Sequence, residues 1–126
     1  MSVLAQIVEN KIIAIIRGAN PTDVMHIAEA LYEGGIRLLE ITMNSAEPLL
    51  VIEQVANKLG DKMVIGAGTV LDANMARDAV QAGATFILSP ILDEGVINAT
   101  KNLGVVSIPG AYTATEIYNA YRTGAD

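Results

Sequence analysis

The chain has 126 residues, the length of one domain, and it is strongly apolar, with 52% hydrophobic and 17% charged residues. Its formal charge of −6 at pH 7 argues against a surface for nucleic acid or anionic membranes, although a small anionic substrate can still bind beside a local arginine. The absence of cysteine and the presence of one histidine exclude disulfides, thiolate metal sites, a cysteine nucleophile and a histidine-rich metal centre.

Apolar runs of strand length alternate with helical patterns along the chain. The runs are rich in Ile, Val and Leu, and they predict strands at Ile12–Arg17, Leu38–Met43, Met63–Thr69, Phe86–Pro90 and Val105–Pro109. None is long enough to span a membrane, and the N-terminus lacks a basic stretch followed by an apolar core. We therefore expect a soluble, cytoplasmic protein without a signal peptide.

The segments between these runs carry signals for helix starts and ends. Polar residues predict N-caps at Asn20 (followed by Pro21), Ser45, Asp72 and Thr113, the last as a capping box with Glu116. Glycines predict left-handed helix ends at Gly35, Gly60, Gly83, Gly104 and Gly124. Strands and helices that alternate with this regular spacing predict βα units and a parallel sheet. A sixth strand is expected after Gly124, and the sequence reaches only Asp126.

Two architectures accommodate five βα units: a complete open sheet of the flavodoxin type, or the first five units of a parallel (β/α)8 barrel. Alternation along the second predicted strand places Glu40, Thr42 and Asn44 on one face and only apolar side chains on the other. A polar face suits a barrel lumen, whereas both faces of an open sheet lie under helices. The pattern therefore favours the barrel, as a single domain over residues 1–126.

Glu40 and Arg17 are the first candidates for chemistry. A carboxylate within an apolar strand is costly to desolvate, so Glu40 is either an ion-pair partner of Arg17 or Arg37, or an acid/base with a shifted pKa. Arg17 ends the first predicted strand, at the rim where barrels carry their active sites. Its guanidinium suits a carboxylate or a phosphate, and pairing with Glu40 is compatible with that role.

Three more strand ends supply candidates at the same rim. Gly66 and Gly68 remove side chains from one face of the third strand, which permits close approach of another backbone or a ligand, or tight packing of the strand against a helix. Thr69 follows them with a hydroxyl and an N–H group. Pro90 and Pro109 close the next two strands, and packing alone would also explain both prolines.

Together these segments resemble the 2-keto-3-deoxy-6-phosphogluconate/4-hydroxy-2-oxoglutarate aldolase family. The matching stretches, in family order, are Ile13–Gly18, Gly34–Met43, Ile65–Val70, Phe86–Pro90 and Ile108–Glu116. The resemblance covers essentially the whole chain after its first ten residues. It implies a trimeric (β/α)8 barrel that reversibly cleaves 2-keto-4-hydroxy acids to pyruvate and an aldehyde through a lysine Schiff base, without metal or cofactor.

The resemblance also implies roles for individual residues. Glu40 matches the general acid/base, and Arg17 and Thr69 match residues that bind the substrate, a small keto acid or phosphosugar acid. Pro90 and Pro109 are candidates for lining the same site. Asn44 is a departure, because phosphogluconate-type enzymes often have arginine there. Asn44 followed by serine is similar instead to the 2-keto-3-deoxy-6-phosphogalactonate aldolases, which gives an alternative substrate.

The family's Schiff-base lysine is expected in the sixth strand, shortly after Asp126. The four lysines of the chain are expected at strand starts or helix ends: Lys11, Lys58, Lys62 and Lys101. We therefore expect the 126-residue chain itself to be inactive. The alternatives are a non-enzymatic, five-stranded open α/β binding module and another barrel, such as a phosphosugar isomerase relative. The Glu40 and Gly66–Thr69 segments favour the aldolases over such a barrel.

Overall fold

The computed structural model describes all 126 residues as five strands and six helices in an α/β arrangement. In chain order the elements are α1 (Val3–Asn10), β1 (Ala14–Ile16), α2 (Pro21–Glu33), β2 (Leu38–Thr42), α3 (Pro48–Leu59), β3 (Val64–Gly68), α4 (Ala73–Ala82), β4 (Phe86–Ser89), α5 (Glu94–Asn102), β5 (Val106–Pro109) and α6 (Ala114–Thr123). All five predicted strands are present, each somewhat shorter than predicted. Helix α1 was not predicted.

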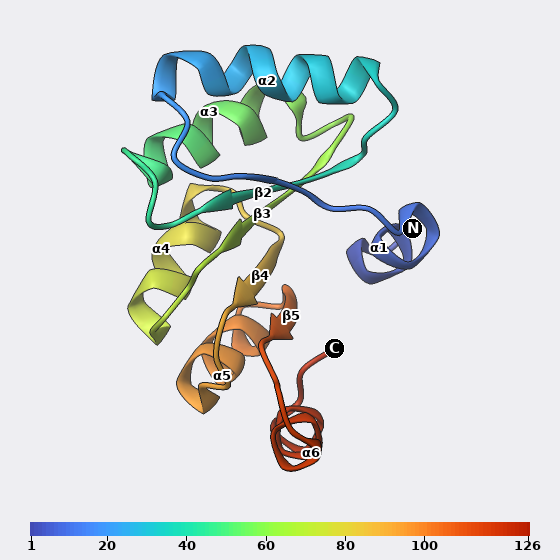
Figure 1. Cartoon of the computed structure of the whole chain (residues 1–126), viewed down its shortest axis with the longest axis vertical. Helices are drawn as coiled ribbons and strands as arrows, with labels where there is room; N and C mark the ends of the chain where they lie inside the picture. The colour runs from blue at the N-terminus through green and yellow to red at the C-terminus, as the bar shows by residue number, and fades with distance from the viewer.

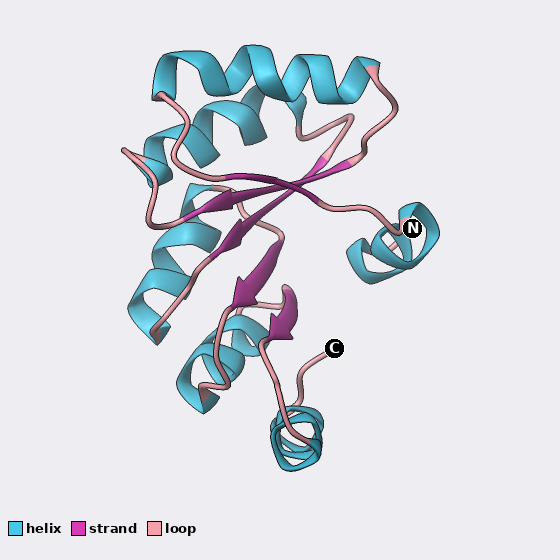
Figure 2. Ribbon diagram, viewed as in Figure 1, coloured by secondary structure: helices cyan, strands magenta, loops and turns pink.

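The five strands form one parallel sheet in the consecutive order β1-β2-β3-β4-β5. A doubly wound sheet of the flavodoxin type changes direction at a switch point, so that its strand order is not consecutive. The sheet fans out with α2, α3, α4 and α5 along one side and α1 on the other (Figures 1 and 2). The prediction of the barrel architecture is confirmed, and the alternative of an open doubly wound sheet is wrong.

Two apolar layers cover the two faces of the sheet. The larger core packs strand side chains such as Leu39, Ile65 and Ile87 against helices α2 to α5. On the opposite face, which we call the inner face, the cluster of buried apolar side chains consists of Leu38, Val64, Phe86 and Val106. Two apolar side chains of α1, Val3 and Ile7, pack against this second cluster. Helix α1 therefore closes the end of the inner face from which the strands start.

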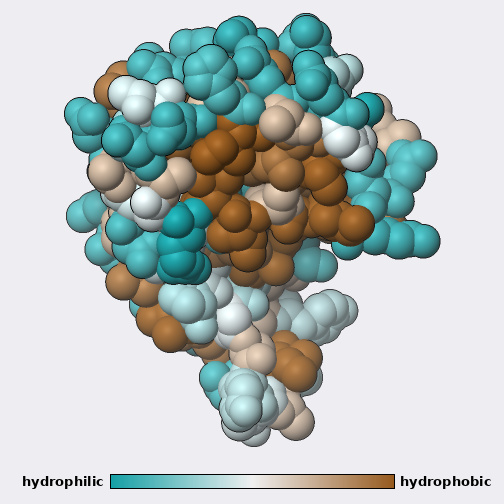
Figure 3. Space-filling view, turned by 45° about the horizontal axis from the view of Figure 1, so that its top comes forward, coloured by the Kyte–Doolittle hydropathy of each residue, from teal (hydrophilic) through white to brown (hydrophobic).

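Not all of the apolar surface of the chain is covered. Figure 3 shows a broad hydrophobic patch in the middle of one face, with hydrophilic residues around it. Ile12 and Ile15, before and within the edge strand β1, are exposed. Since β1 and β5 each have a neighbour on one side only, the sheet has two open edges.

Most of the predicted helix caps are confirmed. The side chains of Asn20, Asp72 and Thr113 accept hydrogen bonds from backbone N–H groups in the first turns of α2, α4 and α6. Ser45 does not cap α3, because that helix begins at Pro48, after Glu47 in a left-handed conformation. The Ser45 hydroxyl instead bonds to residues at the end of β1 and β2.

The predicted left-handed helix ends are confirmed at four of the five glycines. Gly35, Gly83, Gly104 and Gly124 have positive φ angles. Gly60 is right-handed, with φ −64°, so the prediction there is wrong. The reason is local: the N–H groups of Lys62 and Met63 both bond to the carbonyl of Leu59, so the chain continues the helical turn before it enters β3.

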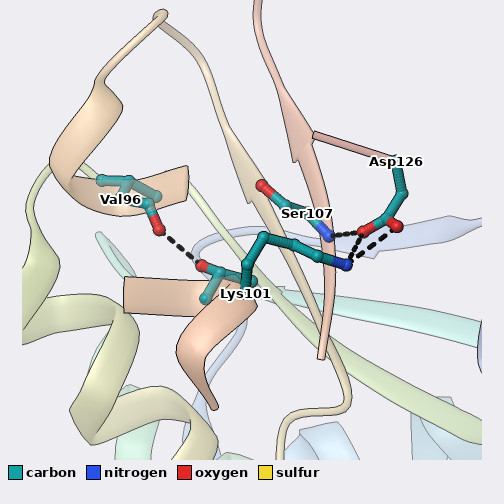
Figure 4. A network of polar contacts seen from close by, with 5 residues as sticks. Val96, Lys101, Ser107 and Asp126 are labelled. Carbon is teal, nitrogen blue, oxygen red and sulfur yellow. Dashed lines mark hydrogen bonds and ion pairs between the residues drawn. The ribbon is translucent and has the colours of Figure 1, made fainter. Parts of the chain in front are cut away.

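The last residue returns to the sheet beside β5. The Asp126 N–H donates to the Ser107 carbonyl (3.0 Å), and the Ser107 N–H donates to the Asp126 carboxylate (2.8 Å). Lys101, from the last turn of α5, donates to both carboxylate oxygens (2.8 and 2.6 Å; Figure 4). Partial burial acts to raise the pKa of Asp126, but the hydrogen bonds from Lys101 and Ser107 hold it below its usual value.

Candidate active site

Glu40 lies in the middle of β2, and its side chain belongs to the inner face. Its neighbours Leu39 and Ile41 belong to the helix-covered core, so alternation directs Glu40 the other way. Only 3% of the residue is exposed. A β-carbon added at Gly68 on β3 would lie 1.5 Å from Oε1 of Glu40, and one added at Gly66 would overlap the Phe86 ring. The two glycines therefore make room for two inward side chains rather than for an approaching backbone.

The Glu40 carboxyl group is buried without a fixed partner. Its Oε2 atom has no hydrogen-bond partner, and Glu40 is in none of the three ion pairs of the structure. Arg37 donates instead to the carbonyls of Tyr32 and Ile36, so the predicted alternative of an ion pair with an arginine is wrong. Burial raises the pKa of Glu40, and the nearby positive charge of Arg17 partly opposes this effect. Such a carboxyl group keeps its proton to higher pH than an exposed glutamate does.

The ends of β1 and β2 are joined by side-chain hydrogen bonds. Arg17 Nη1 donates to Asn44 Oδ1 (3.3 Å), and the Gly18 N–H donates to Ser45 Oγ (2.9 Å). Ser45 Oγ is also 2.8 Å from Oγ1 of Thr42, which is fully buried. The structure therefore brings together Arg17 and Asn44, and it places the charge of Arg17 close enough to Glu40 to act on its carboxyl group. This role of Ser45 and Thr42 was not predicted from the sequence. The available signal was the spacing of the two hydroxyl groups, because Ser45 comes three positions after the inward-facing Thr42.

Thr69 follows β3 in a strained conformation. Its φ of 57° is left-handed, which is rare for a β-branched residue. The flanking backbone is held on both sides, by the bond from the Met43 N–H to the Gly68 carbonyl and by that from the Val70 N–H to the Leu88 carbonyl. Strain of this kind persists only where the surroundings enforce it, and it is common at functional sites. Thr69 is also adjacent to Gly68, the residue that Glu40 overlies.

The two prolines lie at the same rim but farther along the sheet. Pro109 is in register with Ser89, and a β-carbon at Gly110 would lie 2.4 Å from the Pro90 carbonyl oxygen. Pro90 lines a surface pocket together with Tyr112, and Pro109 lines a different one. Neither pocket includes Glu40. The structure thus places both prolines at the expected strand ends and does not bring them into contact with the Glu40 carboxyl group.

The lysines lie away from this rim. Lys11 and Lys62 precede β1 and β3, at the opposite ends of the strands. Lys58 pairs with Glu29 between α3 and α2, and Lys101 pairs with Asp126. No group of three or more His, Cys, Asp or Glu side chains is arranged to hold a metal ion. No helix has the length and apolar character needed to cross a bilayer.

Consecutive parallel strands, outer helices and a buried acid on the inner face define part of a (β/α)8-barrel protein with the features of an enzyme site. The family model for KDPG and KHG aldolases matches residues 3–126, and the chain belongs to this family.

Similar proteins come from both substrate branches of the family. The probable 2-dehydro-3-deoxy-6-phosphogalactonate aldolase of Rhizobium meliloti is 34% identical over 117 residues, which cover 93% of this chain and 55% of the relative. The 2-dehydro-3-deoxy-phosphogluconate aldolase of Pseudoalteromonas atlantica is 38% identical over 105 residues, covering 81% and 48%. The KDPG aldolase of Legionella pneumophila, solved with pyruvate captured as a covalent carbinolamine, superposes with a TM-score of 0.83 at 32% identity, covering 89% and 54%. The chain thus spans about half the length of the relatives it matches.

Proposed function

We propose that the protein is a class I aldolase that reversibly cleaves a 2-keto-3-deoxy-6-phospho sugar acid, or 4-hydroxy-2-oxoglutarate, to pyruvate and an aldehyde through a lysine Schiff base. The observation that carries this proposal is the buried, unpaired Glu40 carboxyl group with its raised pKa, on the inner face of the sheet. Family membership and the pyruvate carbinolamine captured in the Legionella relative support the same chemistry.

Glu40 moves protons in this proposal. Formation and breakdown of a carbinolamine require a proton to be delivered to an oxygen and withdrawn again, and a carboxyl group with a raised pKa can do both. Arg17 binds the anionic end of the substrate, since its guanidinium is exposed and engages only one neutral amide oxygen. Thr69 and Asn44 contribute polar contacts at the same rim, and Pro90 and Pro109 line the site where the next two strands end.

The reacting amine comes from a lysine that follows Asp126. A Schiff-base lysine must be desolvated or placed near positive charge so that part of it is neutral. Lys58 and Lys101 each engage a carboxylate, and Lys11 and Lys62 lie at the wrong ends of the strands. Asp126 already bonds to the edge of β5, as the first residue of a further parallel strand would. Residues 1–126 are the N-terminal part of a single barrel domain, and the whole protein is a cytoplasmic homotrimer that needs no metal or cofactor.

The substrate distinguishes two branches of the proposal. The pair Asn44-Ser45 favours the phosphogalactonate-type acid. Sequence identity does not distinguish the branches, because it is 34% to the phosphogalactonate aldolase and 38% to the phosphogluconate aldolase. Comparing kcat/KM for the phosphogluconate- and phosphogalactonate-type keto acids decides between them. A preference for the gluconate-type acid would contradict the assignment from Asn44-Ser45.

The test of the function is the release of pyruvate by a version of the protein that continues through a sixth strand. Glu40→Gln should lower the turnover by about 10²- to 10⁴-fold, as loss of a positioned acid/base does. Glu53→Gln, on the exposed face of α3, is the matched control and should leave turnover unchanged. Near-normal turnover of Glu40→Gln would remove Glu40 from the mechanism, and no pyruvate release by the unmutated protein would contradict the proposed function.

A further inference from the structure

The loop after β2 holds the end of β1 through two adjacent side chains. The backbone pairing of the two strands ends at Ile16 and Ile41. Beyond that pair, Asn44 accepts a hydrogen bond from the Arg17 side chain, and Ser45 accepts one from the Gly18 backbone, with the same separation of 27 positions in both contacts. Because the separation is equal, the pair Asn44-Ser45 lies alongside the pair Arg17-Gly18, with one hydrogen bond for each residue of the pair. Gly18 has a φ of 70°, so the chain turns directly after Arg17.

Arg17 belongs to the same face of the sheet as Glu40, because it follows Ile15, the register partner of Glu40, by two positions. The strand neighbours of Glu40 are Ile15 on β1 and Gly66 on β3, neither of which carries charge. Gly68, where an added β-carbon would overlap the carboxyl group, is also uncharged. The pKa of Glu40 is raised by burial and lowered only by Arg17. A change in the position of the Arg17 guanidinium should therefore change the pKa of this carboxyl group.

An arginine at this position does not stay near Glu40 without help. Arg17 is exposed, and a long cationic side chain gains rotamer freedom and hydration by turning into water. We propose that Asn44 and Ser45 are positioning residues, which hold the Arg17 guanidinium beside Glu40 so that one cation serves both the carboxyl group and the anionic end of the substrate. The substrate part of this statement rests on the proposed aldolase function, whereas the coupling of Arg17 to Glu40 does not.

The amide of Asn44 is suited to this task because it is neutral. An acceptor oxygen fixes the guanidinium through a hydrogen bond and leaves its positive charge uncompensated. A carboxylate at the same position would hold Arg17 more tightly but would cancel most of its field at Glu40. Ser45 fixes the backbone from which Arg17 extends, and its own hydroxyl is fixed by the buried Thr42.

The test is an NMR titration of the Glu40 carboxyl group in the 126-residue chain, which requires no turnover. Arg17→Met should raise the pKa of Glu40, because the opposing charge is removed. Asn44→Ala should raise it in the same direction and by a comparable amount, and the double variant should titrate like Arg17→Met alone. The matched control is Asn74→Ala, which breaks an equivalent bond, Arg77 Nη1 to Asn74 Oδ1 (2.9 Å), on α4 and should leave Glu40 unchanged.

Two serine variants provide an independent arm. Ser45→Ala should also raise the pKa of Glu40, and Ser45→Thr, which keeps the hydroxyl, should restore it. Thermal unfolding of each variant verifies that it is folded. If Asn44→Ala does not fold, the two Ser45 variants test the proposal in its place. A Glu40 titration that responds to Arg17→Met but not to Asn44→Ala or Ser45→Ala overturns the proposal, as does an equal response to Asn74→Ala. Because the readout is a titration, inactivity of the protein as an aldolase would not affect the outcome.

Discussion

The carboxyl group of Glu40 occupies the space that a side chain at Gly68 would need: a β-carbon there would lie 1.5 Å from Oε1 of Glu40. Gly68→Ala should therefore force Glu40 out of its buried position and lower the free energy of unfolding by about 1–3 kcal/mol, the usual cost of overpacking. Denaturant unfolding of both proteins measures the difference. Gly34→Ala is the control, because the nearest atom to a β-carbon at Gly34 is 3.4 Å away.

The same contact makes a double-variant cycle informative. Glu40→Ala removes the atoms that clash, so Gly68→Ala should cost much less in that background than in the unmutated chain. Equal costs in the two backgrounds would show that Gly68 is required for another reason.

Glu40 should also leave a signature in the dependence of stability on pH. Because the folded state raises the pKa of Glu40 above its ordinary value of 4.5, the folded chain binds more protons than the unfolded chain between the two values. Stability therefore falls as pH rises from 4.5 through the folded pKa of Glu40. Glu40→Gln should remove this fall: the two proteins should be similar at low pH, and the variant should be the more stable one above the window.

Free energies of unfolding of both proteins from acid to neutral pH provide the measurement. Glu53→Gln, a change of the same type on an exposed helix face, should follow the unmutated protein throughout. If Glu40→Gln is less stable than the unmutated protein at neutral pH, the buried carboxylate has a favourable partner that contradicts the unpaired geometry.

Asp126 should stabilise the fold through Ser107 and Lys101. Asp126→Ala removes the acceptor of both donors, at an expected cost of about 1–3 kcal/mol, and hydrogen exchange of the Ser107 amide should become faster. Since the folded pKa of Asp126 is lowered, its contribution is present above the ordinary value of 3.8 and is lost as pH falls through the folded value. Asp61→Ala, at an exposed turn, should change neither quantity. Unchanged exchange at Ser107 would contradict the contact.

The placement of the lysines predicts the result of covalent trapping. Borohydride reduction in the presence of pyruvate should leave the mass of the 126-residue chain unchanged, because its lysines precede strands or pair with carboxylates and none follows the carboxyl end of a strand. A chain that continues through a sixth strand should gain one reduced pyruvate adduct. Intact-mass measurement decides both cases. Stoichiometric labelling of the 126-residue chain would contradict the lysine assignment, and an unlabelled, folded longer chain would contradict the Schiff-base mechanism.

Local signals were sufficient for most of the fold. A strand of apolar residues, a capping side chain and a left-handed glycine each depend on a few neighbouring residues, so Leu38–Met43, Asn20 and Gly83 could be recognised without the tertiary structure. Ser45 shows where this fails. The serine has the chemistry of an N-cap, but its hydroxyl bonds to Thr42 and to Gly18, which lies in the loop after β1. Long-range contacts of this kind leave no local pattern.

The sequence by itself determined the parallel βα repeat and the inward face of Glu40, because periodicity fixes which residues share a face. The resemblance to the aldolase family was likewise visible in the sequence, from the matching stretches of residues. Only the tertiary structure decided what surrounds that face. It brought Gly68 under Glu40, left the carboxyl group without an ion-pair partner, and directed Arg17 to Asn44 and Arg37 to backbone carbonyls. The choice among possible partners depends on strand register and on the path of the loops, and both are set by packing between residues far apart in the chain.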